Sequence, residues 1–507
     1  MRRLAVGTAV LFVAHLGLYL TGNTDGRRWL FLIVTLAVWL VYGLTFRWFV
    51  RSGPVPVPVR PVLTVAVVTA LLQLPGLFFA PVSSTDLGRY VWDGRVQLSG
   101  NDPYRYTPLD DRLAPLRDPI LFPGLRPDER SGWTSEPMPT TRQALLDRAR
   151  NDPRTVLSRP RLPTPYPPIA QVYFTAVSAV TPWSWGVTGF QVAGALAAVA
   201  VGALLAAELR RRGHHPLYAL AWSWCPMVIL EAGNGGHLDV VAAFLAVLAC
   251  TAVARRASAV LVGLVIGAAV AVKLTPLVLL PAFTRWRREA PSLWGAARPG
   301  LVRGTVTLGV LAISYVPHVL VVGPLAAGSV RGYLLEEDGE NRTSLLALIL
   351  PHAAAGPAAI GLCLAVGAWA VFRRPDDTHD DKHDDGDDDV TRPALYLFAA
   401  LLLTTTPVLA WYTLILVALA VLARRPEFGA LAVAGHIAYG GHSYYPATPI
   451  GYALALLTIY LVTTRRWHAA RRATDLPTAP CQANVEGSPD ILGGSLVLQG
   501  REDVNPE

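Results

Sequence analysis

Long apolar blocks separated by short polar turns run through most of the chain. Five blocks come close to the ~20 residues that a membrane-spanning helix needs, namely 4–20, 30–50, 62–79, 187–207 and 300–322. Shorter blocks, as expected for helices that are broken or enclosed in a bundle, are 216–230, 240–254, 260–272, 274–283, 354–372, 394–409, 412–422, 429–439 and 450–463. The pattern predicts an all-α, polytopic membrane helix bundle with about fourteen transmembrane helices.

The composition agrees with a membrane protein. Of the 507 residues, 52% are hydrophobic and 16% are charged, whereas soluble proteins carry about 25% charged residues. The first block starts with Arg2-Arg3, like a secretory signal, but no A-x-A cleavage site follows and a second block comes directly after it. We therefore expect a retained anchor. The 4 cysteines include no C-x-x-C pair, which argues against a disulfide framework or a cysteine metal site.

Arginines gather at the ends of the apolar blocks, which explains the net charge of +8 without a nucleic-acid partner. One path through the plasma membrane puts nearly all these clusters in the cytoplasm: Arg2/Arg3, Arg47/Arg51/Arg60, Arg210–Arg212, Arg255/Arg256, Arg285/Arg287/Arg288, Arg373/Arg374, Arg424/Arg425 and Arg465/Arg466. Arg27-Arg28 are the exception. Both termini are then cytoplasmic, and residues 81–165 are external.

This path divides the chain into parts of different character. They are three N-terminal spans (1–80), an external loop with surface helices (81–185), a membrane core (186–372) with a second external loop (324–342), an acidic cytoplasmic linker (373–392), C-terminal spans (393–464) and a disordered cytoplasmic tail (465–507). Connections longer than ~15 residues are usually functional or disordered. The first external loop is therefore the first place to look for chemistry.

A helix is predicted at the start of that loop, over TDLGRYVWDGRVQL, with residues 83–85 as N-cap candidates. Four of its polar side chains share one face, at i, i+3, i+4 and i+7: Asp86, Arg89, Tyr90 and Asp93. Such a helix suits the membrane surface. Asp86 lies in the first turn, where the helix dipole favours a carboxylate, and an ionised carboxylate is what a general base for a sugar hydroxyl requires. The alternative is that Asp86 merely caps the helix and Arg89–Asp93 is a surface ion pair.

Two further stretches, GNDPYRYTP and PTPYPPIAQVYF, carry tyrosines and prolines. Tyr104 and Tyr166 are candidate substrate contacts, but interfacial tyrosines are also common membrane anchors. The prolines are typical of a stiff spacer that returns the chain to the membrane.

A polar cluster interrupts the apolar pattern at ILEAGNGGHLD. Three glycines break the helix there, and the side chains around them are Glu231, Asn234, His237 and Asp239. Ionisable residues at a broken membrane helix are costly and usually functional. His237 and Asp239 are also possible metal ligands, but no third ligand is in view, so no cofactor is predicted and a divalent metal is not indicated.

Lys273 stands alone in the apolar run AAVAVKLTPLVLLP. An ammonium group at that depth needs an anion. A lipid phosphate is one candidate, and an internal salt bridge to Glu231 or Asp239 is the other. Arg331 and Arg342, in the second external loop, are further candidates for a phosphate.

Four motifs together resemble one family. STDLGRYVWDGRVQLSGNDPYRYTP is similar to the S-S-D-x-Y-R-Y-x-W-D-G-R signature, with its following D/N-P-Y-x-Y-x-P, of GT-C-type bacterial membrane glycosyltransferases. These are the family 87 enzymes and the polyprenol-phosphomannose mannosyltransferases. PTPYPPIAQVYF, LEAGNGGHLD and AVKLTPLVLLP resemble the family's later motifs in the same order. Gly88, and an extra glycine at 235 or 236, depart from the pattern without removing an ionisable residue.

The resemblance implies a GT-C-type bundle whose large first external loop is catalytic. It implies an inverting transfer of a sugar, most readily mannose, from a polyprenyl-phosphate donor to a cell-envelope glycan or glycolipid. The family's catalytic carboxylate carries over to Asp86. A departing lipid phosphate is stabilised by cations, so such an enzyme needs no general acid, whereas a glycosidase uses two carboxylates. The cations expected to stabilise the phosphate are Lys273, Arg331 and Arg342. Sugar or acceptor contacts are expected from Arg89, Tyr90, Asp93, Arg95, Tyr104, Tyr166, Glu231, Asn234, His237 and Asp239.

Two other classes of protein share the hydrophobic pattern. A transporter or flippase of lipid-linked sugars has a similar number of spans and buried charges, but it needs no large external insert and often shows an inverted repeat. A membrane scaffold has no chemistry at all. The enzyme alone would consume a lipid-phosphate donor.

Overall fold

The computed structural model describes residues 1–22, 28–53, 55–284, 291–326, 345–346, 349–372, 390–404, 409–440 and 447–474. Within these ranges the regular structure is helical and no β-strand occurs, which confirms the all-α class. The chain forms two compact units, 1–463 and 464–507. The acidic run of the predicted linker, residues 327–342 of the second external loop and residues 475–507 of the tail lie outside the described residues.

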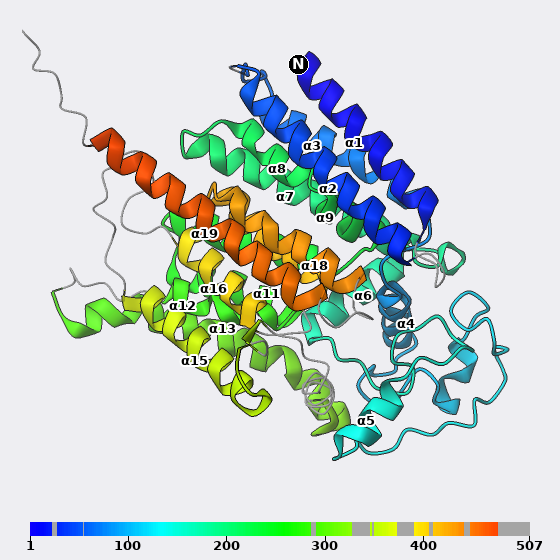
Figure 1. The fold of residues 1–507 in the computed structure, drawn as a ribbon. Helices are drawn as coiled ribbons and strands as arrows, with labels where there is room; N and C mark the ends of the chain where they lie inside the picture. The colour runs from blue at the N-terminus through cyan, green and yellow to red at the C-terminus, as the bar shows by residue number, and fades with distance from the viewer. Residues whose placement is uncertain are drawn as a thin grey trace, which may run out of the picture. The chain divides into compact units, whose positions relative to one another are not determined.

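The first unit contains nearly all of the helices (Figure 1). They are α1 (Arg2–Thr21), α2 (Arg28–Arg51), α3 (Pro61–Gln73), α4 (Asp86–Leu98), α5 (Arg142–Ala149), α6 (Pro168–Val180), α7 (Thr188–Arg211), α8 (Leu220–Ser223), α9 (Pro226–Val228), α10 (Asp239–Ala254), α11 (Ala259–Val272), α12 (Leu280–Phe283), α13 (Leu293–Val322), α15 (His352–Phe372), α16 (Thr391–Thr404), α17 (Thr413–Leu422), α18 (Ala430–Gly440) and α19 (Ala447–Thr474), the last of which continues into the second unit.

The number of membrane spans differs from the prediction. Among the described residues, 7 helices are long and apolar enough to cross a membrane, and the bent pair Pro226–Asn234 and Asp239–Ala254 can make an eighth. The predicted count of about fourteen is not confirmed. Several apolar blocks are too short or too broken for this test, because proline ends or interrupts a helix. Block 216–230, for example, is divided by Pro216 and Pro226 into short helical pieces.

Several arginine-rich turns meet at one end of the first unit. Arg3 donates to the carbonyl oxygen of Gly53 at 3.5 Å, and the Nε2 atom of His215 lies 2.8 Å from the carbonyl oxygen of Val55. Arg255 lies 3.9 Å from Glu208, in the last turns of α7. These contacts bring the N-terminus, the turn after α2, the end of α7 with the turn that follows it, and the turn after α10 to the same end of the unit, as the charge pattern predicts. Their cytoplasmic location stays a prediction.

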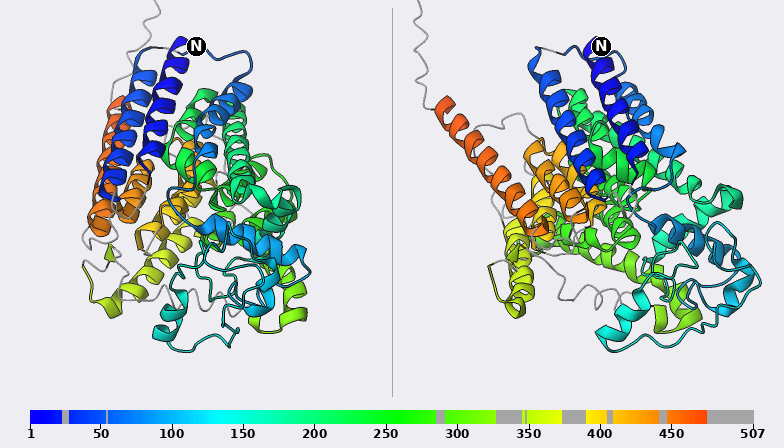
Figure 2. Two further views of the ribbon diagram at one scale, coloured as in Figure 1. Left: turned by 90° about the vertical axis from the view of Figure 1, so that its right-hand side faces the viewer. Right: turned by 45° about the vertical axis from the view of Figure 1, so that its right-hand side comes forward.

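The segment 81–165 lies beyond the other end of α1, away from the N-terminus, in all the views of Figures 1 and 2. It contains α4, the 3₁₀ helix Asp111–Leu116 and α5. Many of its apolar side chains are buried, and Phe122 packs against Trp92 of α4 with 4.8 Å between ring centroids. This segment is therefore a folded structure rather than a flexible connection.

A sharp break separates α9 from α10. The chain passes through a π-helical turn, Ile229–Asn234, and then bends by 118°. Gly236 adopts a φ of +53°, and a Cβ atom there would come 2.6 Å from the Cδ2 atom of Leu87. Glycine is required at this position both by its backbone angle and by the close approach of α4. The break thus brings the N-terminus of α10 against the first turn of α4.

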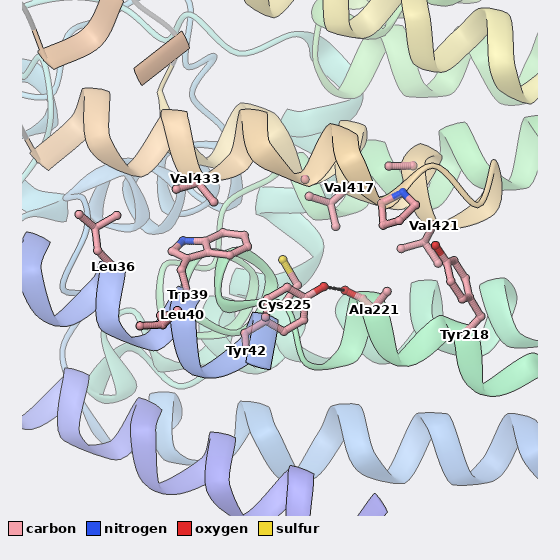
Figure 3. A pocket seen from close by; sticks show the side chains of 14 residues that line it. Leu36, Trp39, Leu40, Tyr42, Tyr218, Ala221, Cys225, Val417, Val421 and Val433 are labelled. Atoms are coloured by element: carbon pink, nitrogen blue, oxygen red, sulfur yellow. Dashed lines mark hydrogen bonds between the residues drawn. The ribbon is translucent and has the colours of Figure 1, made fainter. Parts of the chain in front are cut away.

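An apolar pocket of about 410 Å³ lies between α2, α8 and the α17–α18 region. Figure 3 shows Leu36, Trp39 and Tyr42 on one side of it and Val417, Val421 and Val433 on the other. The Tyr42 hydroxyl group donates to the carbonyl oxygen of Ala221 at 3.1 Å. The Trp39 indole ring lines this pocket, while its N–H group is directed at the buried side chain of His436.

Candidate active site

Asp86 is the first residue of α4, one residue later than the predicted start. Of the three predicted capping residues, Thr85 is the N-cap but makes no side-chain cap bond, and the Ser84 hydroxyl accepts the Asp86 amide at 3.0 Å. The Ser83 hydroxyl points elsewhere, to Glu231. The Asp86 carboxylate is half-buried and accepts no hydrogen bond from any residue that the structure describes.

Arg89, Tyr90, Asp93 and Arg95 of α4 are buried, not exposed at a surface. Arg89 donates to Asp93 at 2.8 Å, as the i,i+4 spacing predicts, but it also donates to the carbonyl oxygens of Arg159 and Leu162. The interpretation as a surface ion pair is therefore wrong, because the loop folds back over this face of α4. A buried guanidinium is tolerated when its donors are all engaged. The hydrogen bonds from Arg89 to these two carbonyl oxygens fasten the loop to α4.

Arg95 and Tyr104 also make structural contacts within the loop. Arg95 pairs with Asp118, donates to the carbonyl oxygen of Trp183 at 3.1 Å and stacks over its ring. The Tyr104 hydroxyl donates to the carbonyl oxygen of Tyr166 at 2.6 Å. These engaged groups are far less available to a substrate than Asp86.

Tyr90 connects the predicted motifs. Its ring stacks on Phe174 and meets Tyr166 edge-on, with centroid distances of 4.5 and 5.1 Å. Burial raises the pKa of the Tyr90 hydroxyl group well above its ordinary value, and the neighbouring Tyr166, Asp86 and Asp239 raise it further. Tyr90 thus lies among residues from three of the four motifs.

Glu231 is fully buried in the π-helical turn and is surrounded by donors. The Ser83 hydroxyl donates to its Oε2 atom at 2.8 Å. The Nδ1 atom of His237 lies 3.1 Å from the same oxygen, and the Nε2 atom of His436, in α18, lies 3.3 Å from Oε1. A buried carboxylate requires such partners. This group of four residues is called the Glu231 network below.

Asn234 fastens the chain that leads into α4. Its side-chain amide donates to the carbonyl oxygens of Gly76, Phe79 and Ala80, and its oxygen accepts the Val82 amide at 3.0 Å. The Asn234 side chain therefore binds backbone groups and positions the segment before α4. The substrate contact expected from the sequence stays a prediction.

Lys273 and Asp239 form a close ion pair at the start of α10. The Nζ atom of Lys273 lies 2.6 Å from the Oδ2 atom of Asp239 and 4.0 Å from the centre of the Tyr412 ring. Next to them, His237 stacks on Trp411 with 3.9 Å between ring centroids. The His237 Nε2 and Asp239 Oδ1 atoms are buried, and neither has a hydrogen-bond partner among the described residues.

The comparison with known families bears on this arrangement. Residues 164–382 match the model of glycosyltransferase family 87. The match covers less than half of the chain, but it contains Tyr166, Glu231, Asp239 and Lys273. It confirms the resemblance to GT-C-type membrane glycosyltransferases and the prediction of a transferase enzyme. The α4 motif lies outside the match. No curated protein and no solved structure matches the chain.

Two predicted site residues are not among those that the structure describes. Arg331 and Arg342 lie outside the described residues. Within the described part of the chain, no three His, Cys, Asp or Glu side chains are grouped so that they could hold a metal ion. His237 and Asp239 have no third ligand there.

Sequence reasoning missed the contribution of the later helices. Trp411 and Tyr412 cover His237 and Lys273, and His436 completes the Glu231 network. His318 of α13 pairs with Asp102 of the loop at 2.7 Å. The available signal was a histidine inside an apolar helix, which is costly unless it is paired.

Proposed function

We propose that this protein transfers a sugar, mannose first among the candidates, from a polyprenyl-phosphate donor to a cell-envelope glycan or glycolipid. The transfer inverts the anomeric centre and takes place at the external face of the plasma membrane. One observation carries the proposal: the half-buried Asp86 carboxylate accepts no hydrogen bond from a described residue, and it lies beside Tyr90, which also neighbours Asp239.

Asp86 is proposed as the general base. Asp93, Asp102 and Asp118 are each engaged by a cationic side chain or histidine, whereas no described residue donates a hydrogen bond to either carboxylate oxygen of Asp86. Its place in the first turn of α4 lets the helix dipole stabilise the ionised form. A carboxylate in this state can take the proton of an acceptor hydroxyl group as that oxygen attacks the sugar.

Lys273 is proposed to stabilise the departing phosphate. An ammonium group has three N–H donors, and one of them is directed at Asp239. The side chain is 15% exposed, so the remaining donors are near the surface of the bundle. Arg331 and Arg342 stay expected phosphate contacts.

His237 and Asp239 are proposed to bind hydroxyl groups. The His237 Nδ1 atom faces the carboxylate and the carbonyl oxygen of Glu231, so in the neutral ring Nδ1 carries the hydrogen and Nε2 is an acceptor. Nε2 and the Asp239 Oδ1 atom are therefore two buried acceptors without a donor in the described part of the chain. Leaving such groups unpaired is unfavourable, and sugar hydroxyl groups supply the missing donors.

The test is a transfer assay on the purified full-length protein in lipid nanodiscs. Radiolabelled polyprenyl-phosphate mannose, arabinose, glucose and galactose are supplied in turn with a membrane glycolipid extract as the acceptor source. We expect one donor to be consumed and its label to enter a new glycolipid. A protein that moves donors between leaflets of proteoliposomes without consuming them would instead be the transporter.

A further inference from the structure

Two side chains of α18 hold Ser83, in the segment that leads into α4. The Tyr439 hydroxyl group donates to the carbonyl oxygen of Ser83. His436 reaches the Ser83 side chain indirectly, because both donate to the Glu231 carboxylate, at 3.3 and 2.8 Å. Ser83 stands three residues before Asp86. The position of Asp86 therefore depends on a helix near the other end of the chain.

Trp39 of α2 fixes the state of His436. Its indole Nε1 atom lies 2.8 Å from the His436 Nδ1 atom, and both side chains are buried. An indole nitrogen can only donate, so Nδ1 must be the acceptor. The hydrogen of the neutral ring is then on Nε2, which faces Glu231. Trp39 thereby turns His436 into a donor to that carboxylate.

The Glu231 network has little tolerance for a lost donor. Glu231 and His237 are fully buried, and Ser83 and His436 nearly so. Removing a donor from a buried carboxylate leaves a group whose desolvation is no longer compensated. The Glu231 carboxylate oxygens would then share the remaining donors or bind water. The Ser83 hydroxyl is the donor that can shift to meet this need, because Ser83 lies in a segment without helical structure.

We infer that Trp39, His436 and Tyr439 are positioning residues for the transfer reaction, and that they act by holding Ser83 and thus the first turn of α4. The inference rests on the proposed function, in which Asp86 is the base. The three residues contact Glu231, Ser83 or one another and need no contact with substrate. They lie outside residues 164–382 and outside all four sequence motifs.

The experiment compares two tryptophan variants that lose the same kind of bond. Trp39→Phe removes the N–H donor to His436 and keeps an aromatic ring. Trp222→Phe is the matched control, because the Trp222 indole is also buried and donates at 2.9 Å to the carbonyl oxygen of Ala198, away from Ser83. Misplacement of a reacting group by about 1 Å can lower a rate 10²-fold. We expect Trp39→Phe to lower kcat by about 10-fold or more with donor KM nearly unchanged, and Trp222→Phe to change neither.

His436 offers a conservative rescue. A glutamine at 436 can accept from Trp39 through its oxygen and donate to Glu231 through its nitrogen, whereas leucine can do neither. We expect His436→Gln to keep kcat within about 5-fold of the wild type and His436→Leu to lose about 100-fold. Equal losses in Trp39→Phe and Trp222→Phe, or a Trp39→Phe variant with wild-type kcat, would overturn the inference.

A second readout is independent of activity. Amide hydrogen exchange over residues 86–92 should quicken in Trp39→Phe and stay unchanged in Trp222→Phe, because only the first loosens the start of α4. If the wild-type protein transfers no sugar from any donor but this exchange pattern is seen, the proposed function fails and the positioning of α4 by Trp39 stands. If the wild type is active and exchange is the same in both variants, the positioning fails.

Discussion

The ammonium nitrogen of Lys273 lies 2.6 Å from one carboxylate oxygen of Asp239, and the other oxygen, Oδ1, is buried without a partner among the described residues. The sequence left a lipid phosphate and an internal salt bridge as alternatives for Lys273. The salt bridge is present in the structure. It does not exclude a phosphate contact, because Lys273 has further N–H donors and the second carboxylate oxygen of Asp239 has no partner among the described residues.

The pair can be tested with single and double substitutions. Lys273→Met alone should lower the stability of the protein by about 3–5 kcal/mol, because it leaves a buried carboxylate unpaired. Lys273→Met combined with Asp239→Asn should recover most of that loss. Thermal unfolding of both variants in detergent measures the loss and the recovery.

The double variant separates the two roles of Lys273. If Lys273 binds the donor phosphate, the folded double variant should show a donor KM at least 10-fold higher, or a lower kcat, than Asp239→Asn alone, which loses the carboxylate but keeps Lys273, and the acceptor KM should be the same in these two variants. A stable double variant with wild-type kinetics would show that the pair serves the fold alone.

Asp86→Asn should lower kcat by about 10²- to 10⁴-fold, the usual contribution of a general base. Donor binding and the unfolding temperature should stay near those of the wild type, because the carboxylate has no hydrogen bond from a described residue to lose. Asp128→Asn is the control, since Asp128 is an exposed carboxylate in the same loop. Activity of Asp86→Asn within tenfold of the wild type would exclude Asp86 as the base.

The loop 81–165 should lose stability only in strong acid. The hydrogen bonds from Arg154 lower the pKa of Asp152 to about 2, with further help from Arg161, whereas an unfolded aspartate titrates near ~3.9. Because the folded pKa is the lower one, the stabilisation is present above about pH 4 and is lost as the pH falls through about 2.

Limited proteolysis of the loop between pH 7 and pH 2 measures this effect. The wild-type loop should resist cleavage equally at pH 7 and pH 5 and become sensitive below about pH 4. Asp152→Asn should be cleaved faster at pH 7 and lose the contribution of Asp152 to the acid sensitivity. Pepsin suits the acidic range, and a neutral protease suits the rest.

Gly236→Ala should weaken the contact between α10 and α4. The substitution adds a methyl group 2.6 Å from Leu87 and places alanine at a φ of +53°, which L-residues disfavour by ~1–2 kcal/mol. Gly213→Ala is the matched control, because Gly213 has a φ of +75° but nothing within 4 Å of the added carbon. The unfolding temperature and kcat should both fall further in Gly236→Ala than in Gly213→Ala. Adding Leu87→Ala to Gly236→Ala should restore part of the loss.

The limits of sequence reasoning are visible in α4. Its amphipathic spacing and its N-terminal polar residues place it within one residue of its observed start. The spacing also gives the Arg89–Asp93 pair. It cannot give the carbonyl partners of Arg89, which come from residues about 70 positions later, because nothing local encodes how a loop folds back. The prediction of an exposed pair was wrong for that reason.

The same holds for the membrane part of the site. The lone Lys273 predicted a lipid phosphate or an internal partner, Glu231 or Asp239, and the structure pairs it with Asp239. The partners of His436 and Trp39 could not be predicted, because an apolar helix indicates burial but not which residues it packs against. The span count was not confirmed because prolines divide apolar blocks into pieces that hydropathy alone cannot distinguish from full crossings.

The hydrogen bond from Tyr439 to Ser83 joins residues 356 positions apart, and this separation has a consequence for biosynthesis. At ~5–20 residues per second, the ribosome needs roughly 20–70 s to make the intervening chain. Ser83 and Glu231 are therefore made and inserted well before His436 and Tyr439 exist. Translation arrested ahead of α18 would yield an inert polypeptide whose Glu231 carboxylate lacks the His436 donor, a polar defect that quality control in the membrane can recognise.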